Sequence, residues 1–220
     1  ALAGLERDID AKMKRTRNRP IPSGAVSPRA ALIFGITISI VSALWLGLLV
    51  NWASAALAVG AILLYVVFYT MILKRRTSQN IVWGGIAGCM PVLIGWSAVT
   101  GTVSWTAVLL FLVIFFWTPP HYWPLAEKFQ ADYAKAGVPM LPVVASRSSV
   151  SRQMLLHTAL MIASSLATIP LGETGWVYGA VAIAAGAWFG FLVIRYALRV
   201  RQGLSGRELA PMKVFHGSIT

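Results

Sequence analysis

The sequence predicts an all-helical membrane protein whose helices cross the lipid bilayer several times. Three observations support this fold class. The 220-residue chain is 57% apolar and only 12% charged, with a mean hydropathy of +0.71, which is too apolar for a water-soluble domain. Lysine and arginine occur only on alternate connections. Four long stretches contain no Asp, Glu, Lys or Arg: residues 30–73, 77–126, 153–172 and 174–194.

The uncharged stretches are long enough for six membrane-spanning helices. Each span needs about 20 apolar residues to cross about 30 Å of hydrocarbon, and a central charge costs about 2.5–3.5 kcal/mol. Turn-forming residues at 51–52 and 100–102 divide the two longest stretches. We therefore expect six complete spans with partial ones at each end. The complete spans are residues 30–50, 54–73, 82–100, 104–119, 153–171 and 176–198, and another begins at about residue 214.

Eighteen of the nineteen Lys and Arg residues lie on connections that alternating spans bring to one side of the membrane, and Arg195 lies near the end of the last span on the same side. Basic residues are retained on the cytoplasmic side, so we expect this side to face the cytoplasm. Orientation in a lipid bilayer explains the net charge of +12, and no nucleic-acid partner is needed.

Acidic residues also gather on the basic side, which orientation alone does not explain. If residues 2–14 form a helix, Glu6 and Asp10 share one face. Two carboxylates on one face could hold Mg²⁺, and Arg15 and Arg19 could bind phosphate oxygens. The alternative is a solvated helix end with alternating charges.

The connection over residues 120–152 is long, and it is too aromatic for a disordered loop. Pro119 and Pro120 are expected to end the preceding span, because neither can donate a backbone hydrogen bond. A short amphipathic helix over residues 121–135 would then carry Asp132.

Two other segments can contact a ligand. Lys74-Arg75-Arg76 is followed by four hydrogen-bonding side chains that end at Asn80, and this connector can bind an anion. The glycines after it, at 84, 85 and 88, favour close helix packing over ligand contact. His121 could bind a metal or stack on a planar ligand, or it could be a polar anchor at the membrane interface. Together these features favour a substrate with a diphosphate head at the membrane surface and a hydrocarbon tail in the bundle.

These segments resemble the UbiA-type intramembrane prenyltransferases. The stretch from Glu6 through Asp10 to Arg19 resembles the first aspartate-rich motif of that family. Three further blocks are similar to its haem-modifying members: Tyr69 to Trp96, Trp117-Thr-Pro-Pro-His-Tyr-Trp123, and Asp132-Tyr133 to Pro142. The chain departs from the family pattern at Leu2, where Asn is usual, at Glu6, where Asp is usual, and at Ala136, where a second Asp is usual.

The resemblance implies one membrane domain over residues 1–220, part of a fold of nine spans around a central cavity. In that register the chain is truncated at both ends and lacks the first span. The implied enzyme transfers the farnesyl group of farnesyl diphosphate to the 2-vinyl group of haem b, which gives the hydroxyethylfarnesyl side chain of haem O. The resemblance also implies Mg²⁺, an inner (cell) membrane location with a cytoplasmic active site, and contact with haem A synthase or oxidase assembly proteins.

The resemblance assigns residues to this reaction. Three carboxylates are assigned to catalysis and to Mg²⁺: Glu6, Asp10 and Asp132. Nine side chains are assigned to the substrates: Arg15, Arg19, Lys74, Arg75, Asn80, His121, Tyr122, Trp123 and Tyr133. The four basic ones would bind diphosphate, and the three at 121–123 would contact haem.

Two other functions fit part of the sequence. Another UbiA-type prenyltransferase would act on an aromatic or quinone precursor, and the blocks at 117–123 and 132–142 argue against it. A non-catalytic membrane partner or a transporter is a different class. Transporters place ionisable groups near the middle of the bilayer, and the expected spans contain no Asp, Glu, Lys or Arg, apart from Arg195 near the end of the last one.

Overall fold

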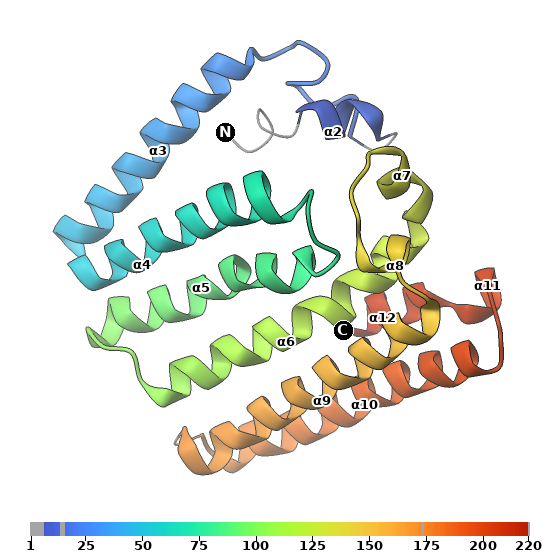
Figure 1. Cartoon of the computed structure of the whole chain (residues 1–220). Coiled ribbons are helices and arrows are strands. Elements are labelled where there is room, and N and C mark those ends of the chain that lie inside the picture. Colours follow the sequence, from blue (N-terminus) through green and yellow to red (C-terminus); the bar gives the residue numbers. More distant parts are fainter. Residues whose placement is uncertain (1–6, 14–15, 173, 220) are drawn as a thin grey trace. The chain divides into compact units, whose positions relative to one another are not determined.

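The computed structural model describes residues 7–13, 16–172 and 174–219 (Figure 1). These residues form helices and no strand, which confirms the predicted fold class. In chain order the helices are α2 (Arg7–Lys12), α3 (Pro28–Leu49), α4 (Trp52–Leu63), the π-helical η1 (Leu64–Leu73), α5 (Asn80–Thr100), α6 (Trp105–Lys128), α7 (Gln130–Lys135), α8 (Leu141–Val144), α9 (Arg147–Leu171), α10 (Trp176–Arg201), α11 (Gly206–Leu209) and α12 (Pro211–Gly217).

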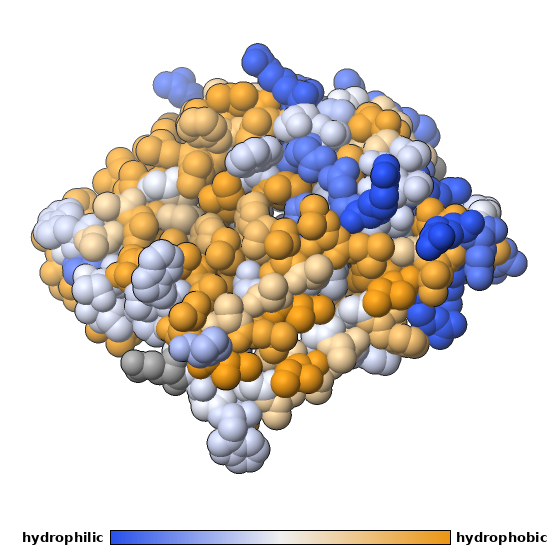
Figure 2. Space-filling model, turned by 60° about the horizontal axis from the view of Figure 1, so that its bottom comes forward, coloured by the Kyte–Doolittle hydropathy of each residue, from blue (hydrophilic) through white to orange (hydrophobic). Residues whose placement is uncertain are grey.

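Six helical stretches are long and apolar enough to cross a membrane, in agreement with the six predicted spans: α3, α4 together with η1, α5, α6, α9 and α10. Their apolar side chains point outward to a degree that water would not tolerate. Phe34, Trp45 and Leu48 of α3, for example, are each more than half exposed. Figure 2 shows apolar side chains over most of the face in view. The chain is therefore a multi-pass membrane protein.

The predicted breaks between paired spans occur where expected. Asn51 caps α4, because its side-chain oxygen accepts a hydrogen bond of 2.8 Å from the backbone N–H of Ser54. Gly101 ends α5 in the left-handed region, with φ at 73°, a conformation that glycine adopts without strain.

The expectation that Pro119 and Pro120 end the fourth span is wrong. α6 runs through both prolines and ends at Lys128. Both rings are buried, and α6 packs against α8, α9 and α12. Neighbouring helices can compensate the backbone groups that a proline frees, so proline is tolerated inside membrane helices. The helix expected over residues 121–135 is consequently divided at Phe129 between α6 and α7.

The helices form two compact units. Unit 1 consists of Ala1–Thr102 and Ala131–Met140, and α4 packs there against α3, η1 and α5. A Cβ added to Gly84 would lie 2.6 Å from ring atoms of Tyr69, whereas one added to Gly88 would meet nothing within 4 Å. The packing role predicted for these glycines is therefore confirmed at Gly84, which lets α5 approach η1.

Unit 2 consists of Val103–Gln130 and Leu141–Thr220. α9 packs against both α6 and α10, and α12 packs against α6 and α10 (Figure 1). Because α6, α9 and α10 alternate in direction, the end of α6, the start of α9 and the end of α10 lie at one end of the unit. The basic residues of this half of the chain occur at that end, as charge alternation predicts.

Candidate functional site

The described part of the acidic N-terminal segment forms α2, in unit 1. Its Asp8 and Asp10 lie in the first turn and Lys12 in the last, which is the order that the helix dipole favours. Asp10 is only 4% exposed, whereas half of the Asp8 side chain is exposed. The two carboxylates thus occupy different environments.

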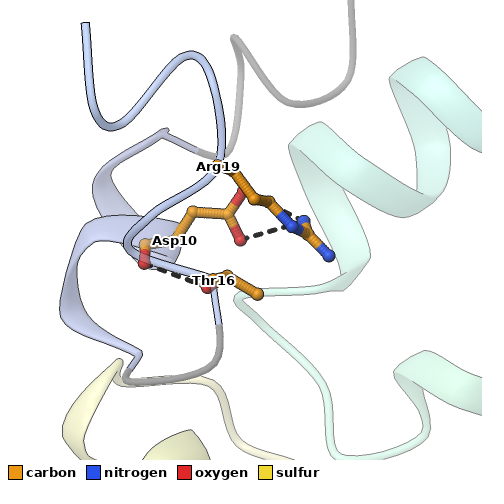
Figure 3. Close-up of polar contacts among 3 residues, drawn as sticks. All are labelled: Asp10, Thr16 and Arg19. Atoms are coloured by element: carbon orange, nitrogen blue, oxygen red, sulfur yellow. Dashed lines mark hydrogen bonds and ion pairs between the residues drawn. The ribbon is translucent and has the colours of Figure 1, made fainter. Parts of the chain in front are cut away.

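Asp10 holds the chain that follows α2 (Figure 3). Arg19 donates from Nη1 to both carboxylate oxygens of Asp10, at 3.2 and 3.1 Å. Thr16 Oγ1 donates to the Asp10 backbone carbonyl at 3.0 Å. The Arg19 side chain remains 48% exposed, and a guanidinium has five N–H donors, so a second anion can still reach it.

Asp8 makes a second ion pair, with Arg75 in the connector that follows η1. The two guanidinium nitrogens Nη1 and Nη2 donate to the two carboxylate oxygens, both at 2.8 Å. The hydrogen bonds from Arg75 hold the pKa of Asp8 below its usual value. Sequence reasoning assigned Arg75 to diphosphate and gave Asp8 no role, because a pair 67 positions apart leaves no local signal.

The same connector carries Lys74 and leads into Asn80, the first residue of α5. The Lys74 Nζ lies 5.9 Å from the ring centroid of Tyr69. Asn80 is fully buried and donates from Nδ2 to the Lys74 carbonyl at 3.4 Å. Its Oδ1 has no hydrogen-bond partner among the described residues. A buried amide oxygen without a partner is costly, which makes this atom a candidate contact for substrate or water.

Asp132 lies on α7, and residues 131–140 belong to unit 1 together with α2. Figure 1 shows α7 near α2. Tyr133, Val138 and Met140 are buried and anchor this segment, whereas Asp132 is half-buried. Within the described ranges its carboxylate has no hydrogen bond or ion pair. Glu6 and Arg15, which were also predicted for this site, lie outside the described residues.

Carboxylate oxygens are the ligands that Mg²⁺ prefers, so the donor chemistry of Asp10 and Asp132 suits this metal. However, no group of three or more His, Cys, Asp or Glu side chains able to hold a metal occurs in the part of the chain that the structure describes. The assignment of Glu6, Asp10 and Asp132 to Mg²⁺ therefore stays a prediction.

His121 lies on α6 in unit 2, between two other rings. Its ring centroid is 4.1 Å from that of Trp117 and 4.8 Å from that of Phe215, and both contacts are stacked. Its Nδ1 lies 2.6 Å from Ser218 Oγ, and Trp117 Nε1 donates to the Ser218 carbonyl at 3.0 Å. These contacts fasten α12 to α6. They leave neither ring face of His121 open to a planar ligand.

The two residues after His121 differ in burial. Tyr122 is half-buried, and Trp123 is fully buried against α9, where its ring contacts that of His157 edge to face at 5.5 Å between centroids. Further along α6, Glu127 accepts hydrogen bonds from Arg147 Nε at 3.2 Å and from Tyr196 Oη at 2.7 Å. Glu127 therefore joins α6, α9 and α10.

Comparison with known proteins places the chain among enzymes. The sequence profile of the UbiA prenyltransferase family matches residues 5–215. A protoheme IX farnesyltransferase of Streptomyces avermitilis is 58% identical over 216 residues, which is 98% of this chain and 71% of that protein. One of Frankia casuarinae is 60% identical over 216 residues, 98% of this chain and 74% of its own length. No solved structure matches the chain.

Unit 1 combines membrane-spanning helices with two pairs of acidic and basic side chains, Asp10–Arg19 and Asp8–Arg75. The matches define the class of the protein, a prenyltransferase. The chain belongs to the UbiA prenyltransferase family.

Proposed function

We propose that the protein converts haem b to haem O with farnesyl diphosphate as the donor. The observation that carries this proposal is the identity of 58–60% with protoheme IX farnesyltransferases over 98% of the chain. The matched region includes the acidic segment of α2, the connector before α5, the aromatic block of α6 and the segment around Asp132.

The proposed reaction breaks the bond between C1 of the farnesyl group and the diphosphate oxygen, and the electron pair leaves with the diphosphate. The π electrons of the 2-vinyl group form a carbon–carbon bond to C1. Water adds to the resulting cation next to the porphyrin and loses a proton. The products are haem O and diphosphate, and no electron is gained or lost overall. The difficult step is departure of the diphosphate, so catalysis needs positive charge around it.

Unit 1 contains the groups proposed for the diphosphate. Asp10 and Asp132, with Glu6, are the carboxylates that would hold Mg²⁺, which neutralises charge on the leaving group when it is bound. Arg19 is held by Asp10 and keeps an exposed side for phosphate oxygens. The Asp8–Arg75 pair ties α2 to the connector that carries Lys74 and Asn80. The Asp8–Arg75 ion pair thus fixes two proposed substrate-binding segments relative to each other: α2 with the chain that follows it, and the connector before α5.

We further propose that the enzyme lies in the inner (cell) membrane with this site on the cytoplasmic side, and that it contacts haem A synthase or oxidase assembly proteins. The one-sided distribution of Lys and Arg supports the orientation. Single cysteines placed at Thr102 and Ser205, in a Cys89→Ala background, test it in intact cells. An impermeant thiol reagent should label the residue at 102 and not the one at 205, and the reverse pattern contradicts the orientation.

The reaction is tested with the full-length gene product, purified in detergent and supplied with haem b, Mg²⁺ and radiolabelled farnesyl diphosphate. We expect the label in a haem whose mass has grown by one farnesyl group and one hydroxyl group. Aromatic acids and quinone precursors serve as competing acceptors in the same assay. Label on one of them, with none on haem, would show that the enzyme is a different prenyltransferase.

A further inference from the structure

A cavity of about 550 Å³ lies at the end of unit 2 that carries the basic residues. Its walls are formed by the end of α6, the start of α9 and the chain that runs from α11 into α12 (Figure 1). Every residue that lines it belongs to unit 2. None of them was assigned to haem b or to farnesyl diphosphate, so the proposed reaction leaves the cavity without a role.

Four basic side chains from three segments line the cavity: Lys128, Arg147, Arg207 and Lys213. All four are exposed. Orientation in the bilayer requires basic residues on this side of the membrane, but it does not require them to surround one cavity. Their convergence therefore needs a second explanation, and an anionic ligand supplies one.

Positive charge in this cavity is only partly compensated. Glu127, the acidic residue among the described ones that line it, accepts hydrogen bonds from Arg147 Nε at 3.2 Å and from Tyr196 Oη at 2.7 Å. The Arg147 side chain stays 52% exposed, so its remaining N–H groups are accessible. The other three basic residues form no ion pair with any described residue. The cavity therefore attracts a negatively charged group.

A run of apolar residues, 209–212, forms one wall of the cavity. Leu209 is 1% exposed, and its carbonyl accepts a hydrogen bond of 3.5 Å from Arg199 Nη1, which ties this wall to α10. Ile194 and Leu198 of α10 are each about half exposed, and such side chains of a membrane-spanning helix contact lipid. The cavity thus combines basic side chains with apolar surface next to a lipid-exposed span, which suits an amphiphilic ligand.

The backbone of this wall has an unfavourable conformation at Ala210, with φ at 50° and ψ at 52°. This is the left-handed region, which residues with a Cβ adopt only at a cost. The residue before a proline also prefers extended geometry, and Pro211 follows. Ala210 is the one non-glycine residue with a positive φ in the described ranges. Such strain is concentrated at ligand-binding sites, and here it lies on the wall of the cavity.

We propose that this cavity binds the headgroup of an acidic phospholipid, with Arg147, Arg207 and Lys213 as donors to its phosphate oxygens. Basic pockets between membrane-spanning helices on the cytoplasmic side bind such headgroups, and guanidinium groups match phosphate geometry. The apolar wall favours a lipid over free phosphate, which would gain nothing from residues 209–212. Binding is non-covalent and does not depend on the proposed reaction. It would hold the end of α6, the start of α9 and α11 together in the membrane.

The test uses the full-length gene product, purified in detergent, with lipid binding measured by native mass spectrometry. Phosphatidylglycerol is the acidic probe and phosphatidylcholine the zwitterionic one. We expect phosphatidylglycerol to bind at least about tenfold more tightly, and this preference should shrink as salt screens the charges. The double variant Arg207→Gln, Lys213→Gln should raise the dissociation constant of phosphatidylglycerol about 30-fold, the factor that two basic groups at a membrane surface supply.

The matched control is the double variant Arg152→Gln, Arg201→Gln, which removes two exposed basic residues of unit 2 that do not line the cavity. Both double variants change the net charge equally, so a general attraction of the basic side to acidic lipid would affect them alike. If the cavity variant does not accumulate, Arg207→Gln and Lys213→Gln are measured singly, each with an expected effect of about fivefold.

Equal losses in the cavity variant and the control would overturn the inference, as would equal affinity for the two lipids. Competition identifies the occupant. Displacement of phosphatidylglycerol by inorganic phosphate at equal concentration would indicate a site for a free anion, and displacement by haem b would indicate an acceptor site; either result contradicts a lipid site. The proposed function fails separately, when the wild-type protein makes no haem O, and that result would leave lipid binding intact.

Discussion

Asp8 and Asp10 lie two positions apart on α2, and each carboxylate fixes a different part of unit 1. Asp10, almost fully buried, holds Arg19 and the chain after α2. Asp8, half exposed, holds Arg75 and the connector before α5. The exposed pair is expected to contribute little to stability. The buried carboxylate is the stronger candidate for catalysis, because a charge with little access to water interacts more strongly with a metal or a substrate.

Replacing Asp8 with Asn should lower the free energy of unfolding by less than about 1 kcal/mol at neutral pH, since an exposed pair is screened by water. The pKa of Asp8 is lower in the folded protein than in the unfolded one. The contribution of Asp8 to the free energy of unfolding is therefore fully present above its pKa in the unfolded protein, about 3.9. It is lost as the pH falls through its pKa in the folded protein. Thermal unfolding in detergent should show a gap between wild type and variant at neutral pH that closes in acid. A gap that stays the same in acid would contradict this assignment.

At the residue scale, the sequence draws attention to charged side chains but does not predict which partners they contact. Asp10 and Arg19 were both assigned to ligands, and their mutual hydrogen bonds were not foreseen. The pairing spans nine positions and depends on the chain turning back after α2, whereas sequence rules describe neighbours three or four positions apart on a helix.

At the element scale, predictions based on a local cause succeeded. Asn51 caps α4 and Gly101 ends α5 through their own side chain or backbone. The prediction from Pro119 and Pro120 failed, because the fate of a proline in a membrane helix depends on what packs around it. Thr118 Oγ1 donates a hydrogen bond to the backbone carbonyl of Ile114, one turn earlier in α6, at 2.8 Å. The aromatic block of α6 is consequently part of a span and not of a surface loop.

The contact between α5 and η1 can be tested with two glycines of one helix. Gly84→Ala should destabilise the protein by about 1–3 kcal/mol, because the new methyl group would overlap the Tyr69 ring unless η1 moves away. Gly88→Ala is the control, since its methyl group would enter open space. We expect this control to be neutral or slightly stabilising. Thermal unfolding in detergent compares the two variants, and equal effects would exclude the packing role of Gly84.

At the scale of the whole molecule, the helices are surrounded by lipid and not by water. The high apolar content and low charge of the sequence predict this environment without any structural information. The number of spans followed from the uncharged stretches, and the family followed from four motif blocks. The division into two compact units was not foreseen, because it depends on which helices pack together and not on where spans begin. Each unit carries the residues proposed for one substrate. Unit 1 has those for the diphosphate, and unit 2 has those for haem.

The central claim, haem farnesylation that depends on Asp10, is tested most directly by the haems extracted from cells. The host is a bacterium without its own haem farnesyltransferase, and it expresses the full-length gene product, the Asp10→Asn variant or a Glu208→Gln control. Glu208 is an exposed acid in unit 2, so its variant changes the charge equally. We expect haem O with the wild type and the control, and about 100-fold less with Asp10→Asn at equal protein levels. Cells that express the wild type and contain haem b alone, or an Asp10→Asn variant as productive as the control, would contradict the account.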